Sequence, residues 1–126
     1  MITEDYVSFE TAKLLKEKGF DSEECFAFYK ENGKMGFLQT FGDIADYNSE
    51  TCVLAPTLQM AMKWLRKNHN FYIDPYPEDN KTWCLIIWEL YPKCVKQCKG
   101  KYDDHSYSTP EEACEAAIKY CLENLI

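Results

Sequence analysis

Hydrophobic residues recur with two different periods along the 126-residue chain. Apolar positions at helical spacing predict three helices, which begin near Ser8, Pro56 and Thr109. Between them, runs rich in aromatic and β-branched residues predict strands within 25–41 and 71–91. The pattern therefore predicts an α+β fold, in which an antiparallel sheet of about four strands carries three helices in the order α-β-β-α-β-β-α.

The helix ends carry strong local signals. Ser8 is a preferred N-cap residue, and Gly19 suits the left-handed position that follows a helix, so the first helix is expected between them. For the last helix, Thr109 as N-cap, Pro110 as first helical residue and Glu112 two residues later form a capping box. The apolar stripe of that helix, which we expect to face the core, comprises Cys114, Ala117, Ile118, Cys121, Leu122 and Leu125.

The strand regions are divided by turn signals. The dipeptide Asn32-Gly33 favours a type I′ turn and therefore a hairpin. Residues 71–74 are expected to form a short strand, and PYPEDN, 75–80, a prolyl turn. The run TWCLIIWELY, 82–91, has apolar residues on both faces, which predicts a central strand that is at least partly covered on each side.

The composition is that of an ordinary globular chain, with 46% hydrophobic and 15% aromatic residues and no Pro/Gly/Ser-rich linker. A length of 126 residues fits one domain, so residues 1–126 are expected to fold as a single domain. The first ten residues, MITEDYVSFE, lack the order of a signal peptide, and no apolar run is long enough to cross a membrane. These features predict a cytoplasmic protein with no membrane contact, in which the seven cysteines are free thiols.

The net charge of −7 is unevenly spread along the chain. Residues 1–55 carry 5 Lys or Arg against 11 Asp or Glu, and residues 102–126 carry 1 against 6. Residues 56–101 carry 8 against 4, so only the middle of the chain is basic. The overall acidity disfavours general nucleic-acid binding, but the basic middle leaves a local anion-binding face as a candidate.

The segment PKCVKQCKGK, 92–101, contains four lysines and no acid. Basic and aromatic side chains together are typical of proteins that bind single-stranded nucleic acid. Such a contact is not favoured here, because most aromatic residues nearby also fit core positions, and lysines on an edge strand commonly prevent aggregation. The segment is therefore interpreted as a loop or edge strand, and the candidate binding residues are Lys93, Lys96, Lys99, Lys101, Trp64 and Tyr91.

Metal binding and catalysis find little support in the sequence. Cys94 and Cys98 are four residues apart and His105 is the nearest further ligand, but the second close pair typical of a zinc site is missing. Redox C-x-x-C, glycine-rich phosphate-loop, H-E-x-x-H and G-x-S-x-G motifs are absent as well. The sequence therefore predicts neither a cofactor nor an enzyme.

Three stretches together resemble a family of small hypothetical proteins that are encoded by phages, prophages and mobile elements of gut bacteria. They are YVSFETAKLLKEKGFDSEEC, 6–25, LAPTLQMAMKWLRKNHN, 54–70, and YSTPEEACEAAIKYCLENLI, 107–126. The resemblance implies an accessory protein that acts in a bacterial host cell, and it carries over no functional residue. The region 71–106 is the least typical of that family.

Three functions follow as hypotheses. The first is a non-enzymatic protein-interaction module of unknown target, for which a homodimer through aromatic residues of 71–91 is one option. The second is an acidic inhibitor of a host defence nuclease, either a restriction or an RNA-guided enzyme, which would imitate nucleic-acid phosphates with the acidic ends of the chain. The third is weak nucleic-acid binding through the basic residues 93–101.

Overall fold

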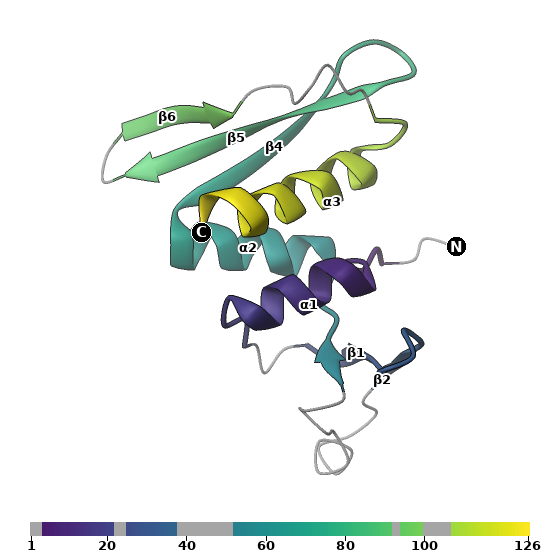
Figure 1. Ribbon diagram of the computed structural model, residues 1–126. Coiled ribbons are helices and arrows are strands. Elements are labelled where there is room, and N and C mark those ends of the chain that lie inside the picture. The colour runs from purple at the N-terminus through teal and green to yellow at the C-terminus, as the bar shows by residue number, and fades with distance from the viewer. Residues whose placement is uncertain (1–3, 22–24, 38–51, 92–93, 100–106) are drawn as a thin grey trace. The chain divides into compact units, whose positions relative to one another are not determined.

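The chain is α+β, as the sequence predicts, and its strands lie in two sheets. The computed structural model describes residues 4–21, 25–37, 52–91, 94–99 and 107–126, and the side chains of all these except 91 and 94–99 (Figure 1). The fold divides into two compact units, Met1–Thr57 and Leu58–Ile126. Each unit has its own three-stranded antiparallel sheet, so the strands do not form the single sheet of about four that we expected. The prediction of one domain stays a prediction.

In the first unit, helix α1 (Phe9–Glu17) has the caps that the sequence predicts. The Ser8 hydroxyl accepts a hydrogen bond from the Thr11 backbone N–H at 3.1 Å, which confirms Ser8 as N-cap. At the other end Gly19 has φ +90°, and its N–H donates to the Lys16 carbonyl at 3.1 Å. The Phe20 N–H donates to the Leu15 carbonyl at 2.9 Å, which completes a Schellman motif whose two apolar residues are both buried.

The predicted hairpin consists of β1 (Ala27–Tyr29) and β2 (Met35–Phe37), paired from Ala27–Phe37 to Tyr29–Met35. The Gly33 N–H donates to the Lys30 carbonyl at 2.8 Å, and Gly33 has φ +84°. Among the non-glycine residues that the structure describes, only Asn70 has a positive φ, so the predicted type I′ turn, which needs one at Asn32 as well, is wrong. The loop is a type I turn followed by a glycine bulge, another connection that suits the twist of a hairpin.

A third strand, β3 (Val53–Leu54), pairs antiparallel with β1 and completes the order β2-β1-β3. Two hydrogen bonds connect this part of the unit to the segment that precedes α1. The Tyr29 hydroxyl donates to the Val7 carbonyl at 2.6 Å, and the Val7 N–H donates to the Pro56 carbonyl at 3.0 Å. Buried apolar side chains of the helix, the strands and the segments beside them form the core of the unit, namely Val7, Ala12, Leu15, Phe20, Cys25, Ala27, Val53 and Ala55.

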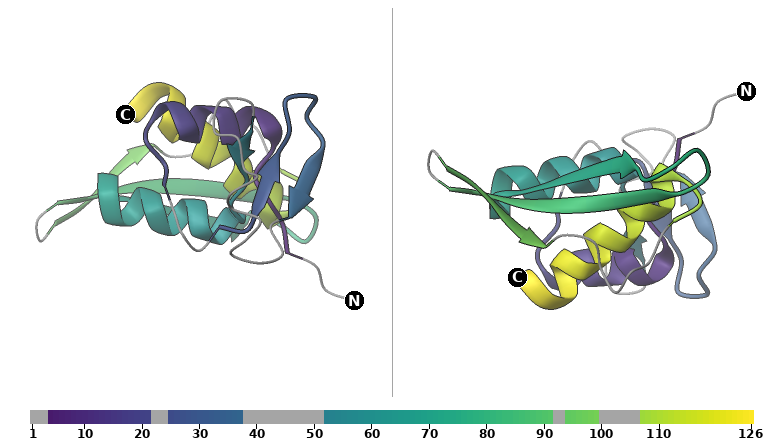
Figure 2. Two further views of the ribbon diagram at one scale, coloured as in Figure 1. Left: turned by 90° about the horizontal axis from the view of Figure 1, so that it is seen from below. Right: turned by 90° about the horizontal axis from the view of Figure 1, so that it is seen from above.

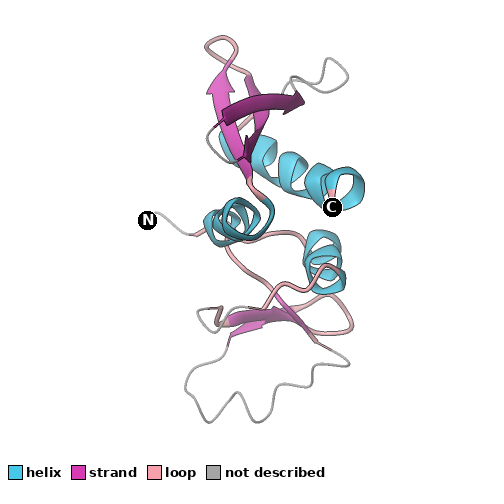
Figure 3. Ribbon diagram, turned by 90° about the vertical axis from the view of Figure 1, so that its left-hand side faces the viewer, coloured by secondary structure: helices cyan, strands magenta, loops and turns pink. Residues whose placement is uncertain are grey.

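The second unit places two helices on one side of a sheet (Figures 2 and 3). The helices are α2 (Leu58–His69) and α3 (Pro110–Tyr120), and the sheet has the order β4-β5-β6. Helix α2 begins at Leu58. Pro56 therefore precedes the helix by two residues, and the prediction that it belongs to the first turn is wrong. A π-helical turn (Cys121–Leu125) continues α3 to the end of the chain.

The strands of this sheet are β4 (Phe71–Pro77), β5 (Trp83–Tyr91) and β6 (Cys94–Lys99). The prediction that a prolyl turn begins at Pro75 is wrong, because β4 continues through Pro77 and the turn to β5 follows it. In that turn Asp79 accepts hydrogen bonds from the backbone N–H groups of Lys81 at 2.8 Å and Thr82 at 2.9 Å. These bonds stabilise the carboxylate and lower the pKa of Asp79.

The two faces of this sheet differ in how they are covered. Leu85 and Ile87 of β5 and Ile73 of β4 are buried, and the strand register puts all three on one face. The opposite face includes Trp88, which is half-buried, and its partner Tyr72, which is 45% exposed. The helices therefore cover the first face. Cys84 of β5 is buried on the opposite face, which confirms the prediction that β5 is partly covered on both sides.

Helix α3 has the predicted capping box. The Glu112 N–H donates to the Thr109 hydroxyl at 3.1 Å, and the Glu112 carboxylate accepts from the Ser108 N–H at 3.1 Å. The predicted apolar stripe is buried from Cys114 to Leu122, so the expectation that Cys114 and Cys121 belong to the core is confirmed.

Candidate functional site

The lysine-rich segment contains an edge strand. Within the described residues β6 pairs with β5 alone, so the interpretation of this segment as an edge strand is confirmed. The register shifts between Ile87 and Trp88, where Lys99 and Gln97 are the successive partners on β6. This irregularity interrupts the strict alternation along the strand, and bulges of this kind are common at sheet edges.

The structure does not describe the side chains of the four candidate lysines. The backbone of Lys96 and Lys99 lies in β6, but their side chains are outside the described part of the structure. Lys93 and Lys101 lie outside the described residues altogether. Anion binding by this segment therefore stays a prediction.

The two candidate aromatic residues lie on different elements. Tyr91 ends β5, and its side chain is not described. Trp64 lies on α2, is half-buried and packs edge-on against the His69 ring, with 4.8 Å between the ring centroids. The His69 ring therefore covers part of the Trp64 ring, and a role of Trp64 in binding stays a prediction.

The candidate metal ligands Cys94, Cys98 and His105 also have no described side chains. Within the described residues no group of three or more His, Cys, Asp or Glu side chains could hold a metal ion. The five cysteines whose side chains are described form no disulfide bond with one another, and four of them are buried: Cys25, Cys84, Cys114 and Cys121.

Burial raises the pKa of one of these thiols, so the stability of the fold depends on alkaline pH. Desolvation, followed by the charge of Glu111, raises the pKa of Cys114 from 9.0 to about 11. Since the fold favours the neutral thiol, its contribution to stability is complete below pH 9 and is lost as pH rises toward 11. We therefore expect the free energy of unfolding to fall by about 2 kcal/mol more in the wild type than in Cys114→Ala over this range.

Chemical denaturation at several pH values measures this difference, and Cys52→Ala is the matched control because Cys52 is only half-buried. Equal slopes for the wild type and Cys114→Ala between pH 9 and 11 would contradict the assignment.

A different site emerges where α2 meets the edge strand β4. A groove of about 380 Å³ lies between them, which is within the range of small-ligand and side-chain binding sites. Its lining combines apolar, amide and basic side chains: Gln59, Met62, Lys63, Arg66, Tyr72, Ile73 and Pro75. We call this feature the α2–β4 groove.

The α2–β4 groove is positively charged. Lys63 and Arg66 are exposed and three residues apart, so they are neighbours on one side of α2. The sequence of α2, LQMAMKWLRKNH, contains no acidic residue, and Asp74, the only acid of β4, is not part of the lining. A ligand that offers carboxylates or phosphates together with an apolar group would match this lining, because Met62 and Ile73 are apolar while the cations are exposed.

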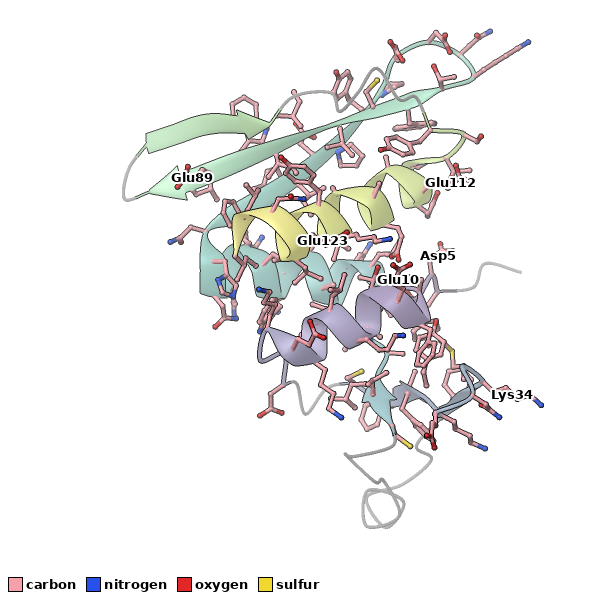
Figure 4. The ribbon with its side chains drawn as sticks, in the orientation of Figure 1. Asp5, Glu10, Lys34, Glu89, Glu112 and Glu123 are labelled. Atoms are coloured by element: carbon pink, nitrogen blue, oxygen red, sulfur yellow. The ribbon has the colours of Figure 1, made fainter. Side chains whose placement is uncertain are left out.

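Helix α3 of the same unit carries the opposite charge. Glu111, Glu112 and Glu123 are exposed along α3 and its π-helical extension, and Figure 4 labels two of them. The unit therefore presents a basic groove at α2 and an acidic surface at α3. An extended polyanion would meet repulsion at α3, whereas a short acidic segment needs contact only with α2.

Sequence reasoning did not find the α2–β4 groove. A signal was present, because Lys63, Arg66 and Lys67 lie off the apolar stripe of their helix. The missing information was the position of β4, whose Tyr72, Ile73 and Pro75 complete the lining.

No protein-family model matches this chain, and no curated protein or solved structure matches it significantly. The similarity to proteins of phages and mobile elements therefore stays a prediction. No helix in the described ranges is long and apolar enough to cross a membrane.

Proposed function

We propose that this protein is a non-enzymatic protein-interaction module whose second unit binds an acidic segment of a partner protein. The observation that carries the proposal is the α2–β4 groove, where Lys63 and Arg66 lie beside apolar side chains on a helix without acids. As an accessory protein of a phage or mobile element, it would act by occupying a surface of a host protein.

The chemistry of the groove favours carboxylate ligands on a protein. The planar guanidinium of Arg66 can bind a carboxylate with two parallel hydrogen bonds, and the ammonium of Lys63 adds a second positive charge. Met62 of α2 and Pro75 of β4, which are half-buried, offer contact to an apolar side chain of the same segment. Polar groups that fix orientation around an apolar contact are typical of specific binding sites.

The nucleic-acid hypothesis receives less support from the described residues. Single-stranded nucleic acid is bound by stacking on aromatic rings along a basic path, but the Trp64 ring packs on His69. The exposed glutamates of α3 would repel a phosphate backbone that extends beyond the groove.

The nuclease-inhibitor hypothesis requires an acidic surface that imitates a row of phosphates. In the first unit Glu10 and Glu17 of α1 are exposed, but Lys13, Lys16 and Lys18 on and after the same helix are exposed as well. Since charges of both signs are interspersed there, α1 does not offer a uniformly negative row. The hypothesis would therefore depend on the exposed Glu111, Glu112 and Glu123 of the second unit. We favour the acidic-partner proposal, because the α2–β4 groove combines positive charge with apolar contact.

The proposal predicts that reversing either groove charge weakens binding of an acidic peptide. The probe is a fluorescent peptide of about 20 residues in which glutamates surround a leucine on an alanine background. Lys63→Glu and Arg66→Glu should each reduce its affinity about tenfold, because each variant replaces an attractive charge by a repulsive one. Fluorescence anisotropy at low and physiological salt measures the change.

Lys81→Glu is the matched control, because it changes the net charge equally but lies in the exposed turn between β4 and β5, outside the groove. It should change the affinity less than about twofold. The proposal fails if Arg66→Glu and Lys81→Glu have the same effect. It fails as well if a single-stranded oligonucleotide binds more tightly than the peptide.

A further inference from the structure

Two backbone hydrogen bonds define which residues of β4 point their N–H and C=O groups toward β5. The Leu90 N–H donates to the Asn70 carbonyl at 2.7 Å, and the Glu78 N–H donates to the Thr82 carbonyl at 2.9 Å. Both contacts join even-numbered residues at the two ends of the β4–β5 ladder. The backbone N–H and C=O groups of successive residues point to opposite sides of a strand. Those of the even residues of β4 therefore point toward β5, and those of the odd residues point toward the outer edge of the sheet.

Two of the four outward-facing residues are prolines. Phe71 and Ile73 keep a backbone N–H on the outer edge of β4, whereas Pro75 and Pro77 have none. Prolines are tolerated in a sheet at such positions, since no ladder hydrogen bond is lost there. This half of the edge therefore offers carbonyl groups without the donors that an added strand requires.

The same edge borders the α2–β4 groove, because Ile73 and Pro75 belong to its lining. A partner segment in the groove therefore lies beside a strand edge that cannot form continuous β-sheet hydrogen bonds with that segment. Strand addition, a frequent mode of peptide recognition, depends on continuous main-chain hydrogen bonds.

We infer that the α2–β4 groove selects acidic segments in helical conformation and rejects the same chemistry presented on a β-strand. This inference rests on the proposed function. Lys63 and Arg66 are three residues apart on α2, which places their Cβ atoms about 5–6 Å from each other. Carboxylates three or four residues apart on a partner helix have the same spacing, and an apolar residue of the same face would contact the half-buried Met62.

Two peptides of equal length and charge test the inference. One is the helical alanine-based probe with glutamates three and four residues from a leucine, and the other alternates glutamate with valine and threonine, which favours a strand. The wild type should bind the helical peptide at least about tenfold more tightly. Hydrogen exchange of the Phe71 and Ile73 amides, which would be protected by an added strand, should not slow when the helical peptide binds.

The variant Pro75→Val/Pro77→Val restores two donors at the outer edge. It should bind the strand peptide more tightly than the wild type does, so that the preference for the helical peptide falls toward one. The ratio of the two affinities is the readout, because Pro75 also lines the groove. Circular dichroism checks that the variant keeps the wild-type fold.

Three results would overturn the inference: equal or tighter binding of the strand peptide by the wild type, slowed exchange at Phe71 and Ile73, or an unchanged preference in the double variant. Each of these leaves the proposed function intact if binding still depends on Lys63 and Arg66. If neither peptide binds the wild type more tightly than Lys63→Glu/Arg66→Glu, the proposed function itself fails, and the inference fails with it.

Discussion

Replacing Leu65 with alanine is expected to lower the free energy of unfolding by about 2–5 kcal/mol. Leu65 is fully buried on α2, on the stripe with Leu58 and Ala61 that faces the interior of the second unit. Its removal loses the transfer free energy of the side chain and leaves a cavity where the helix packs. Because small proteins are stable by only about 5–15 kcal/mol, this loss is a large part of the total.

Urea denaturation followed by circular dichroism and tryptophan fluorescence measures the effect. Lys67→Ala on the same helix is the control, because Lys67 is exposed, and it should change stability by less than about 0.5 kcal/mol. A loss below about 1 kcal/mol for Leu65→Ala would contradict the described packing of α2.

A loss of about 3–5 kcal/mol is expected for Phe20→Ala in the first unit. Phe20 follows the left-handed Gly19, and its burial beside the Leu15 end of α1 completes the Schellman motif. Truncation removes this apolar contact while the backbone hydrogen bond from residue 20 to the Leu15 carbonyl can still form. The variant therefore isolates the contribution of the side chain.

The same denaturation series measures Phe20→Ala, with Phe26→Ala as control because Phe26 is 53% exposed. Phe20→Ala and Phe26→Ala with equal stabilities would contradict the buried position of Phe20. The pair Leu65→Ala and Phe20→Ala also tests the prediction of one domain. One domain requires that both substitutions shift a single cooperative transition, whereas separate domains give one shifted and one unshifted transition.

Features that depend on neighbouring residues could be predicted from the sequence. Ser8, Gly19 and Thr109 act at helix ends through bonds to residues only three to five positions away. The hairpin was predicted for the same reason. Its turn type was not, because a glycine with positive φ after Asn32 fits both a type I′ turn and a type I turn with a bulge.

Features that depend on distant residues could not be predicted in this way. Division of the strands between two sheets is decided by which strand edges meet, and β3 is only two residues long. The local sequence around Pro75 and Pro77 predicts a turn. Both prolines are compatible with β4, because the backbone N–H positions of its odd residues point away from β5.

The candidate site shows the same limit. The basic character of residues 56–101 is visible in the sequence, and the four lysines of 93–101 are its largest lysine cluster. Lys63 and Arg66 gain their role only from the apolar side chains that β4 brings beside α2. A basic patch on a helix becomes a candidate binding site when a second element supplies its other wall.

A nuclear magnetic resonance titration of the whole protein with the acidic helical peptide tests the central claim most directly. We expect the amide resonances of residues 59–66 and 72–75 to shift progressively, and we expect Lys63→Glu/Arg66→Glu and high salt to suppress the shifts. Shifts that concentrate on α3 or in the first unit, or that persist in the double variant, would contradict the claim that the α2–β4 groove binds acidic partners.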